Sequence, residues 1–242
     1  MLKEQLHTMP VTEAFKEDCE CNICKLYDKL ENDRVDFVMG SSYMNDDIRM
    51  ETNKKGFCTK HIHMMYQRQN RQGLALILHT HMQNTNSIIR DLIKKDNGSN
   101  TKGLFQKKNN DPLTDYLKEL EHSCYVCEYL DENFERYLYT VIHCYFHDEE
   151  FQKQFREGKG FCTRHYLMLR EVALKRLSGK KADEFLQCLN EVYLSNMERV
   201  TDDLEWFTDK FDYRNADAPW KNAKDALPRT IIKTNSTDIL AN

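Results

Sequence analysis

The stretch Gly56-Phe57-Cys58-Thr59-Lys60-His61 returns almost unchanged as Gly160-Phe161-Cys162-Thr163-Arg164-His165. Each copy follows a Cys-x-x-Cys pair, which is Cys21/Cys24 in the first copy and Cys124/Cys127 in the second. The interval from this pair to the cysteine of the Gly-Phe-Cys motif is 34 residues in one copy (58 − 24) and 35 in the other (162 − 127). Two sets of three cysteines and one histidine therefore occur in one chain at nearly the same spacing.

Three cysteines and one histidine are a common ligand set of structural zinc. The two ligands of each half-motif are three residues apart, so a helical turn presents both on one face. We predict two zinc ions per chain, with four protein ligands each and no open position for a reacting water, which disfavours hydrolytic chemistry. The predicted metal ligands are Cys21, Cys24, Cys58, His61, Cys124, Cys127, Cys162 and His165.

The same ligands allow other chemistry. An iron–sulfur cluster with a histidine ligand is one alternative, and a thiol–disulfide switch is another. The spacing also leaves open which halves share an ion. One site in each repeat is the simplest division, but Cys21/Cys24 meeting Cys162/His165 would obey the same local geometry. Lys60 and Arg164, each beside its histidine, could partly balance the negative charge of three thiolates.

Glycine and proline are scarce and apolar residues recur with helical spacing, which predicts an all-α fold. The segment that begins at Pro10 is echoed 102 residues later at Pro112 (112 − 10), and both prolines are expected near a helix start. Internal duplication is the simplest account. We expect a first helical repeat at 1–97, a linker at 98–111, a second repeat at 112–212, and a tail at 213–242 that Trp220 anchors and that frays from Lys233 onward.

The composition restricts the function. The 242 residues carry a formal net charge of −4, which argues against a dedicated nucleic-acid binder. No secretory signal or membrane-spanning run is visible, so we expect a cytoplasmic protein without a membrane partner. In a reducing compartment, Cys-x-x-Cys pairs are more often metal ligands or redox centres than structural disulfides. Three cysteines remain outside the repeated pattern: Cys19, Cys144 and Cys188.

The chain resembles a bacterial family of uncharacterised proteins, catalogued as a domain of unknown function. In the first half, the resemblance is carried by Pro10-Val11-x-Glu13-Ala14-Phe15, Cys21-x-x-Cys24, Glu51-Thr52-Asn53-x-Lys55-Gly56-Phe57-Cys58-x-x-His61 and Arg71-x-Gly73-Leu74-Ala75-Leu76. In the tail, it is carried by Phe211-x-Tyr213-Arg214, Pro219-Trp220 and Lys224-Asp225-Ala226-Leu227-Pro228-Arg229. The resemblance covers nearly the whole chain, and it implies both Cys/His quartets but no activity.

Three functional hypotheses follow. The first is a non-enzymatic scaffold or adaptor that binds a protein partner or a second copy of itself, since the sites are closed and no catalytic motif is present. The second is a redox- or metal-responsive protein that uses iron–sulfur clusters or reactive zinc. The third is nucleic-acid binding through the segment 153–181, whose nine basic residues are Lys153, Arg156, Lys159, Arg164, Arg170, Lys175, Arg176, Lys180 and Lys181. For that segment we favour an ordinary solvated helix face.

Overall fold

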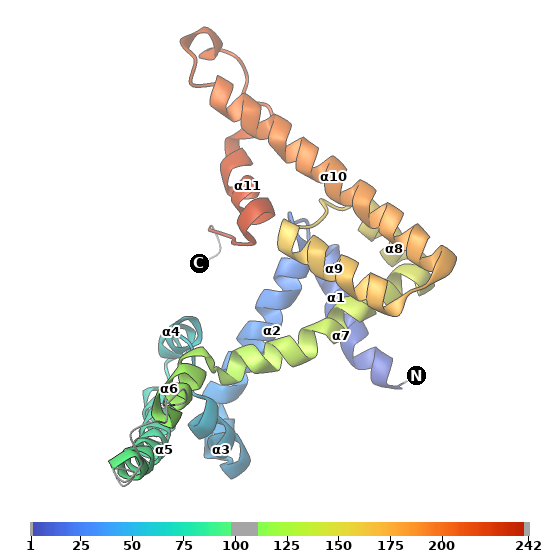
Figure 1. The fold of residues 1–242 in the computed structure, drawn as a ribbon. Helices are drawn as coiled ribbons and strands as arrows, with labels where there is room; N and C mark the ends of the chain where they lie inside the picture. The colour runs from blue at the N-terminus through green and yellow to red at the C-terminus, as the bar shows by residue number, and fades with distance from the viewer. Residues whose placement is uncertain (1, 98–110, 240–242) are drawn as a thin grey trace, which may run out of the picture. The chain divides into compact units, whose positions relative to one another are not determined.

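The computed structural model describes residues 2–97 and 111–239, so most of the expected linker at 98–111 lies outside the described residues. The described ranges contain eleven α-helices and three short 3-10 helices and no β-strand (Figure 1). The all-α prediction is confirmed. None of the helices in the described part of the chain is long and apolar enough to cross a bilayer.

The chain forms two compact units that differ from the expected repeats. Unit 1 comprises Met1–Lys29 and Asn133–Asn242, and unit 2 comprises Leu30–Glu132. Two helices, α2 (Asn22–Met39) and α7 (Tyr125–His147), contribute residues to both units. Each unit thus combines residues from both halves of the sequence, and the duplication itself stays a sequence-based prediction.

Unit 1 is organised around buried aromatic side chains. Phe161, from the repeated motif, packs with Phe155 at a ring-centroid distance of 5.1 Å, and Phe15 packs with Phe151 at 4.5 Å. These rings are at most 5 % exposed, so the phenylalanine of the motif fixes the ligand turn to the core. Besides parts of α2 and α7, unit 1 contains α1 (Leu2–Lys16), α8 (Glu149–Glu157), α9 (Thr163–Arg176), α10 (Gly179–Asp209), η2 (Tyr213–Asn215), η3 (Ala223–Asp225) and α11 (Ala226–Asn235).

Unit 2 contains the rest of α2 and the start of α7, and its helices α3 (Asp46–Lys55) and α5 (Arg71–Asn97) pack against each other. The guanidinium of Arg34 lies over the rings of Tyr125 and Tyr129, 4.5 and 4.0 Å from their centroids, and so joins α2 to α7. The other elements of the unit are η1 (Ser41–Met44), α4 (Thr59–Gln67) and α6 (Pro112–His122).

The two prolines of the proposed repeat occupy different positions. Pro112 is the first residue of α6, and the Asp111 carboxylate caps that helix by accepting from the backbone N–H of Leu113. Pro10 lies inside α1, so the expected helix start at Pro10 is wrong. An interior proline costs a helix one backbone hydrogen bond, which α1 tolerates while Val11, Ala14 and Phe15 remain buried.

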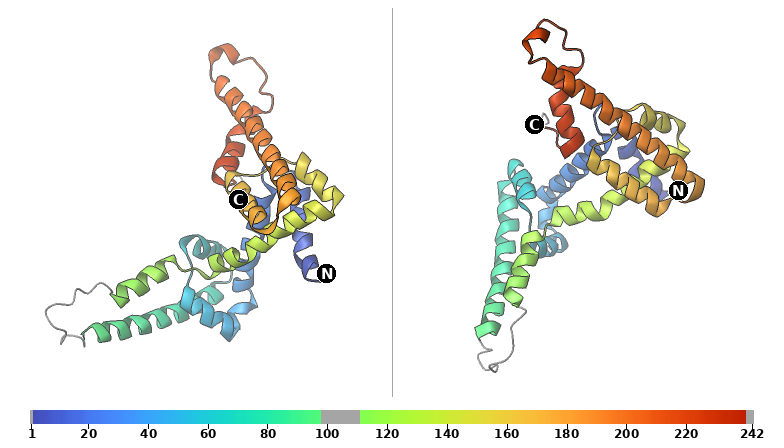
Figure 2. Two further views of the ribbon diagram at one scale, coloured as in Figure 1. Left: turned by 45° about the vertical axis from the view of Figure 1, so that its right-hand side comes forward. Right: turned by 45° about the horizontal axis from the view of Figure 1, so that its top comes forward.

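The C-terminal segment folds back onto unit 1. Helix α11 lies beside α10 in all three ribbon views, and the two helices are in contact (Figures 1 and 2). In the turn between them, the Trp220 ring lies 6.0 Å from that of Phe207. The expectation that the chain frays from Lys233 is wrong, because α11 continues to Asn235 and Lys233 is only 1 % exposed.

Candidate metal centres

All eight predicted ligands come together in two groups, and each group takes one half from each repeat. The unit 1 centre consists of Cys21, Cys24, Cys162 and His165, and the unit 2 centre consists of Cys58, His61, Cys124 and Cys127. Within each centre the four donor atoms lie within 4.8 Å of one another, so each could hold a metal ion. This is the crossed pairing that the sequence left open, and not one site within each repeat.

Each centre lies where two helices begin. In unit 1, Cys21 directly precedes α2, and Cys162 is at the N-cap position of α9 without a side-chain capping hydrogen bond. In unit 2, Cys124 directly precedes α7, and Cys58 is at the N-cap position of α4, likewise without a side-chain capping hydrogen bond. The second ligand of every pair then lies in the first helical turn. Helix N-termini carry partial positive charge and unpaired N–H groups, which stabilise thiolates and offset the negative charge of a Cys₃His site.

Each Gly-Phe-Cys motif begins with a glycine that has a positive φ. Gly56 ends α3 at φ 62°, and Gly160 has φ 75°. A Cβ atom on Gly56 would lie 2.8 Å from the His81 ring, and one on Gly160 would lie 3.0 Å from the Val192 carbonyl oxygen. Only glycine combines this backbone conformation with such close packing behind the ligand turn.

The donor distances in the unit 1 centre are those of atoms around one small ion. His165 directs Nδ1 at the three sulfurs, 3.2 Å from Cys162 Sγ, 3.3 Å from Cys24 Sγ and 3.5 Å from Cys21 Sγ. The sulfurs of Cys24 and Cys162 are 3.7 Å apart. Ligands at ordinary zinc bond lengths on a tetrahedron would be separated by about 3.8 Å between sulfurs and about 3.6 Å between sulfur and nitrogen.

The unit 2 centre repeats this geometry. His61 Nδ1 lies 3.2 Å from Cys58 Sγ, 3.3 Å from Cys124 Sγ and 3.4 Å from Cys127 Sγ. The sulfurs of Cys58 and Cys127 are 3.8 Å apart. All nine cysteines, which lie within the described ranges, are free thiols. The residues present therefore fit a single tetrahedral ion in both units.

The electrostatics of the unit 2 centre favour a charged ligand pair. Burial lowers the pKa of His61, but hydrogen bonds with Cys124 and Glu31 outweigh it and raise that pKa to about 10. Burial raises the pKa of Cys124, but its hydrogen bond with His61 outweighs the effect and lowers that pKa to about 6. Burial and the neighbouring Cys124 thiolate raise the pKa of Cys127.

In the unit 1 centre one sulfur holds the charge. Hydrogen bonds from Cys21 and Cys24 lower the pKa of the Cys162 thiol, which makes Cys162 the thiolate of the group. Burial raises the pKa of Cys21 to about 12, and the hydrogen bond with Cys162 raises the pKa of Cys24. A metal ion that binds here replaces the protons of those two thiols.

The charged residues beside the two histidines have different roles. Lys60 binds the Glu31 carboxylate at 2.6 Å, and the same carboxylate accepts from His61 Nε2 at 2.9 Å. Burial raises the pKa of Glu31, but hydrogen bonds from His61 and Lys60 outweigh it and lower that pKa. Arg164 instead lies over the Tyr27 ring at 5.2 Å.

The contacts of the C-terminal segment with the unit 1 centre were not predicted from any sequence pattern. The Ser236 hydroxyl donates a 3.1 Å hydrogen bond to Cys162 Sγ, and the Lys233 carbonyl accepts from Thr163 Oγ1 at 3.2 Å. The Lys233 ammonium donates to the carbonyl oxygens of Glu20 and Lys159, which flank the two ligand turns in the sequence. Because Lys233 and Ser236 belong to no repeated motif, only the folded chain could reveal that the C-terminal segment contacts this centre.

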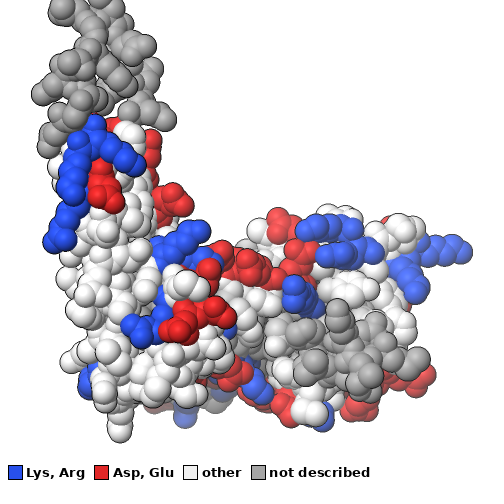
Figure 3. All heavy atoms as spheres, turned by 90° about the horizontal axis from the view of Figure 1, so that it is seen from below, with Lys and Arg blue, Asp and Glu red and all other residues white. Residues whose placement is uncertain are grey.

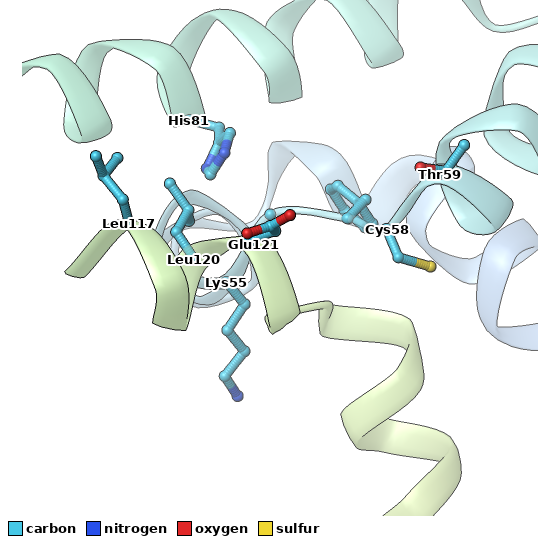
Figure 4. Close-up of a pocket in the computed structure, with 9 residues that line it drawn as sticks. Lys55, Cys58, Thr59, His81, Leu117, Leu120 and Glu121 are labelled. Atoms are coloured by element: carbon cyan, nitrogen blue, oxygen red, sulfur yellow. The ribbon is translucent and has the colours of Figure 1, made fainter. Parts of the chain in front are cut away.

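A cavity of about 440 Å³ borders the ligand turn of unit 2 (Figure 4). His81 of α5 and Leu117, Leu120 and Glu121 of α6 line it together with residues 55–59. In Figure 4 the Cys58 sulfur points away from His81, so this cavity opens on the backbone of the turn. His81 Nδ1 donates to the Asn53 carbonyl at 2.8 Å, which fits a packed histidine rather than a ligand.

Many basic side chains of the segment 153–181 have partners within unit 1. Lys159 pairs with Asp18 at 2.6 Å, and Lys175 and Arg176 pair with Glu135 at 3.0 and 3.2 Å. On the face shown in Figure 3, basic and acidic side chains are interspersed. The ion pairs of the segment fit a solvated surface better than a nucleic-acid interface. Nucleic-acid binding by the segment stays a hypothesis that a salt-dependent binding assay can test.

A comparison with models of protein families identifies the family of this chain. The model of a family of unknown function (DUF6062) matches residues 2–240. The chain belongs to this family. The resemblance inferred from the motifs is thereby confirmed, and membership in DUF6062 assigns no activity. Searches of curated proteins and of solved structures gave no match.

Proposed function

We propose that this protein is a non-enzymatic scaffold or adaptor in which one structural zinc ion stabilises each helical unit. The observation that carries the proposal is the closure of two Cys₃His groups, each with four protein donors at tetrahedral spacing. Four protein ligands leave no coordination position for a substrate or a reacting water. Each ion joins helix starts that are far apart in the sequence, and structural zinc contributes on the order of 10 kcal/mol to folding in small domains.

The compact spacing supports zinc over an iron–sulfur cluster. In a cluster, the four side chains bind different iron atoms, so their donors lie further apart than around a single ion. Donor atoms within 4.8 Å of one another fit one ion more closely. Cys₃His is also a frequent ligand set of structural zinc.

The scaffold role is supported by apolar side chains on the surface of unit 1. Leu167 and Leu174 are seven residues apart on α9 and are 53 % and 58 % exposed. On α10, Leu194 is 57 % exposed. Such residues on a rigid helix pair suit the docking of a partner helix or of a second copy of the chain.

Two measurements test this function. Elemental analysis of anaerobically purified full-length protein should give about two zinc per chain and a colourless solution, and a folded metal-free protein would refute the proposal. Sedimentation velocity at increasing concentration tests self-association. A concentration-dependent shift that the double variant Leu167→Ser/Leu174→Ser removes would support a second copy as the partner, whereas an unchanged shift would exclude this surface.

A redox- or metal-responsive role is the second candidate. Its supporting observation is that Cys24, Cys58 and Cys127 are only partly buried, so that an oxidant can reach a ligand sulfur in each centre. Zinc-bound thiolates are oxidisable. Mild peroxide should then release zinc from the intact protein, and retention of both ions would exclude this role.

A further inference from the structure

The two centres differ at one corresponding position. Seven residues after Cys24 the chain has Glu31 (31 − 24), and seven residues after Cys127 it has Phe134 (134 − 127). Glu31 lies on α2 two helical turns after Cys24, Phe134 lies on α7 two turns after Cys127, and both side chains are buried. Each helix thus starts at one centre and brings this residue to the histidine of the other centre, where it decides what surrounds the imidazole.

In unit 2 this position supplies a carboxylate. The Glu31 carboxylate accepts from His61 Nε2 at 2.9 Å, while Nδ1 of the same ring faces the three sulfurs. A carboxylate on the outer nitrogen fixes the tautomer and orientation of a ligating imidazole and raises its basicity. The side chains of Glu31 and His61 are only 4 % and 2 % exposed, so water competes little for this contact.

In unit 1 the position supplies a phenyl ring. The ring centroids of Phe134 and Tyr27 lie 5.8 and 6.2 Å from that of His165. His165 Nε2 is buried and has no hydrogen-bond partner in the described part of the chain. When Nδ1 binds an ion, Nε2 must carry the proton, and a buried N–H without an acceptor is unfavourable.

We infer from this difference that the two centres hold zinc unequally. The unit 2 centre is the permanent one, and the unit 1 centre is the exchangeable one. Loss of an imidazole's outer partner typically weakens a metal site 10- to 100-fold, so we expect a difference of about that size. The inference rests on the proposed zinc binding and assigns a separate role to each ion.

Because α11 contacts the unit 1 centre, the lower zinc affinity of that centre has a structural consequence. Ser236 and Thr163 tie the C-terminal segment to the Cys162–His165 turn, and Lys25 pairs with Asp238 at 3.3 Å beside Cys24. Without zinc, the turn loses the ion that fixes Cys162 and His165 to α2. The contacts of Ser236 and Thr163 then lose their rigid support, so zinc release from unit 1 loosens α11 while unit 2 stays folded.

Hydrogen exchange of the full-length zinc-loaded protein tests the order of release. A zinc chelator is titrated in, and backbone exchange is followed by mass spectrometry in α9 and α11 of unit 1 and in α4 of unit 2. We expect exchange to rise first in α9 and α11, and in α4 only at free zinc at least ten-fold lower. An earlier rise of exchange in α4, or a rise in both units at the same free zinc concentration, would overturn the inference. A protein that never binds zinc would instead refute the proposed function.

Substitution of Glu31 tests the cause. Glu31→Gln and Glu31→Leu should lower the zinc affinity of unit 2 by about ten-fold or more, with the larger loss for leucine, which lacks an acceptor. Glu128→Gln is the matched control, because it removes a carboxylate beside Cys127 that pairs with Lys55 and not with an imidazole. Equal loss in Glu31→Gln and Glu128→Gln would show that charge alone matters and would overturn the role of Glu31.

Discussion

At the scale of single residues, the ligand turns depend on two glycines and one buried lysine. Sequence reasoning identified the glycines as part of the repeated motif, and the structure shows that both have a positive φ. Sequence reasoning misplaced the lysine, because a polar C-terminus is expected to fray. The burial of Lys233 depends on the Glu20 and Lys159 carbonyl groups, which are 213 and 74 residues away in the sequence. No local pattern encodes such partners.

Gly160→Ala should destabilise the protein by about 1–3 kcal/mol, because alanine at φ 75° is strained and its Cβ would meet the Val192 carbonyl at 3.0 Å. Chemical denaturation of the zinc-loaded protein measures the loss. Gly179→Ala is the control, since Gly179 has φ 56° but its added Cβ would have nothing within 4 Å. Equal losses in both variants would show that close packing behind the ligand turn does not matter.

Lys233→Met should cost about 1–3 kcal/mol of folding free energy, because the buried carbonyl groups of Glu20 and Lys159 lose their donor. Burial lowers the pKa of Lys233, so removing the charge recovers part of the desolvation cost and limits the loss. The exposed Lys224→Met is the control. A Lys233→Met variant as stable as that control would contradict the account of the tail.

The nine cysteines should differ in their rates of alkylation. Burial raises the pKa of Cys144 to about 11 and also raises the pKa of Cys188, so both should resist iodoacetamide at neutral pH. Burial also raises the pKa of Cys19, but Cys19 is only partly buried and is not a predicted zinc ligand, so in the zinc-loaded protein it should react before the other cysteines. Peptide mass spectrometry checks this, and chelation should add the ligand thiols to the labelled set. Rapid labelling of Cys144 before unfolding would be inconsistent with the structure.

At the scale of secondary-structure elements, both centres use helix starts. Spacing alone predicted that the two ligands of each half-motif face the same side, since residues at i and i+3 of a helical turn share a face. It could not say which starts meet, because all four half-motifs are locally alike. The crossed pairing brings the ligands at the start of α2 to those at the start of α9, and the ligands at the start of α7 to those at the start of α4, which is tertiary information.

Zinc uptake should release protons, at least about two per ion at neutral pH. In unit 1, the raised pKa values of Cys21 and Cys24 mean that both thiols are protonated before zinc binds. In unit 2, Cys127 and His61 are protonated for the same reason. Affinity must therefore fall as the pH falls, since protons compete for the ligands. Calorimetry in buffers of different ionisation enthalpy counts the protons, and uptake without release would contradict these shifts.

At the scale of the whole molecule, two zinc-sized sites lie in two compact units that interleave the halves of the sequence. Composition and periodicity were sufficient to predict the helical class. The division into units could not be predicted from the sequence, because the boundaries between the units fall inside α2 and α7 and no change in composition marks them. The sequence contained Glu31 and Phe134, but only the folded chain shows that each approaches an imidazole.

X-ray absorption at the zinc edge of the anaerobically purified full-length protein measures the proposed coordination of both ions. We expect two zinc per chain with an average first shell of three sulfurs at about 2.3 Å and one nitrogen at about 2.0 Å. A folded protein without bound metal, or a first shell dominated by oxygen, would contradict the proposed coordination.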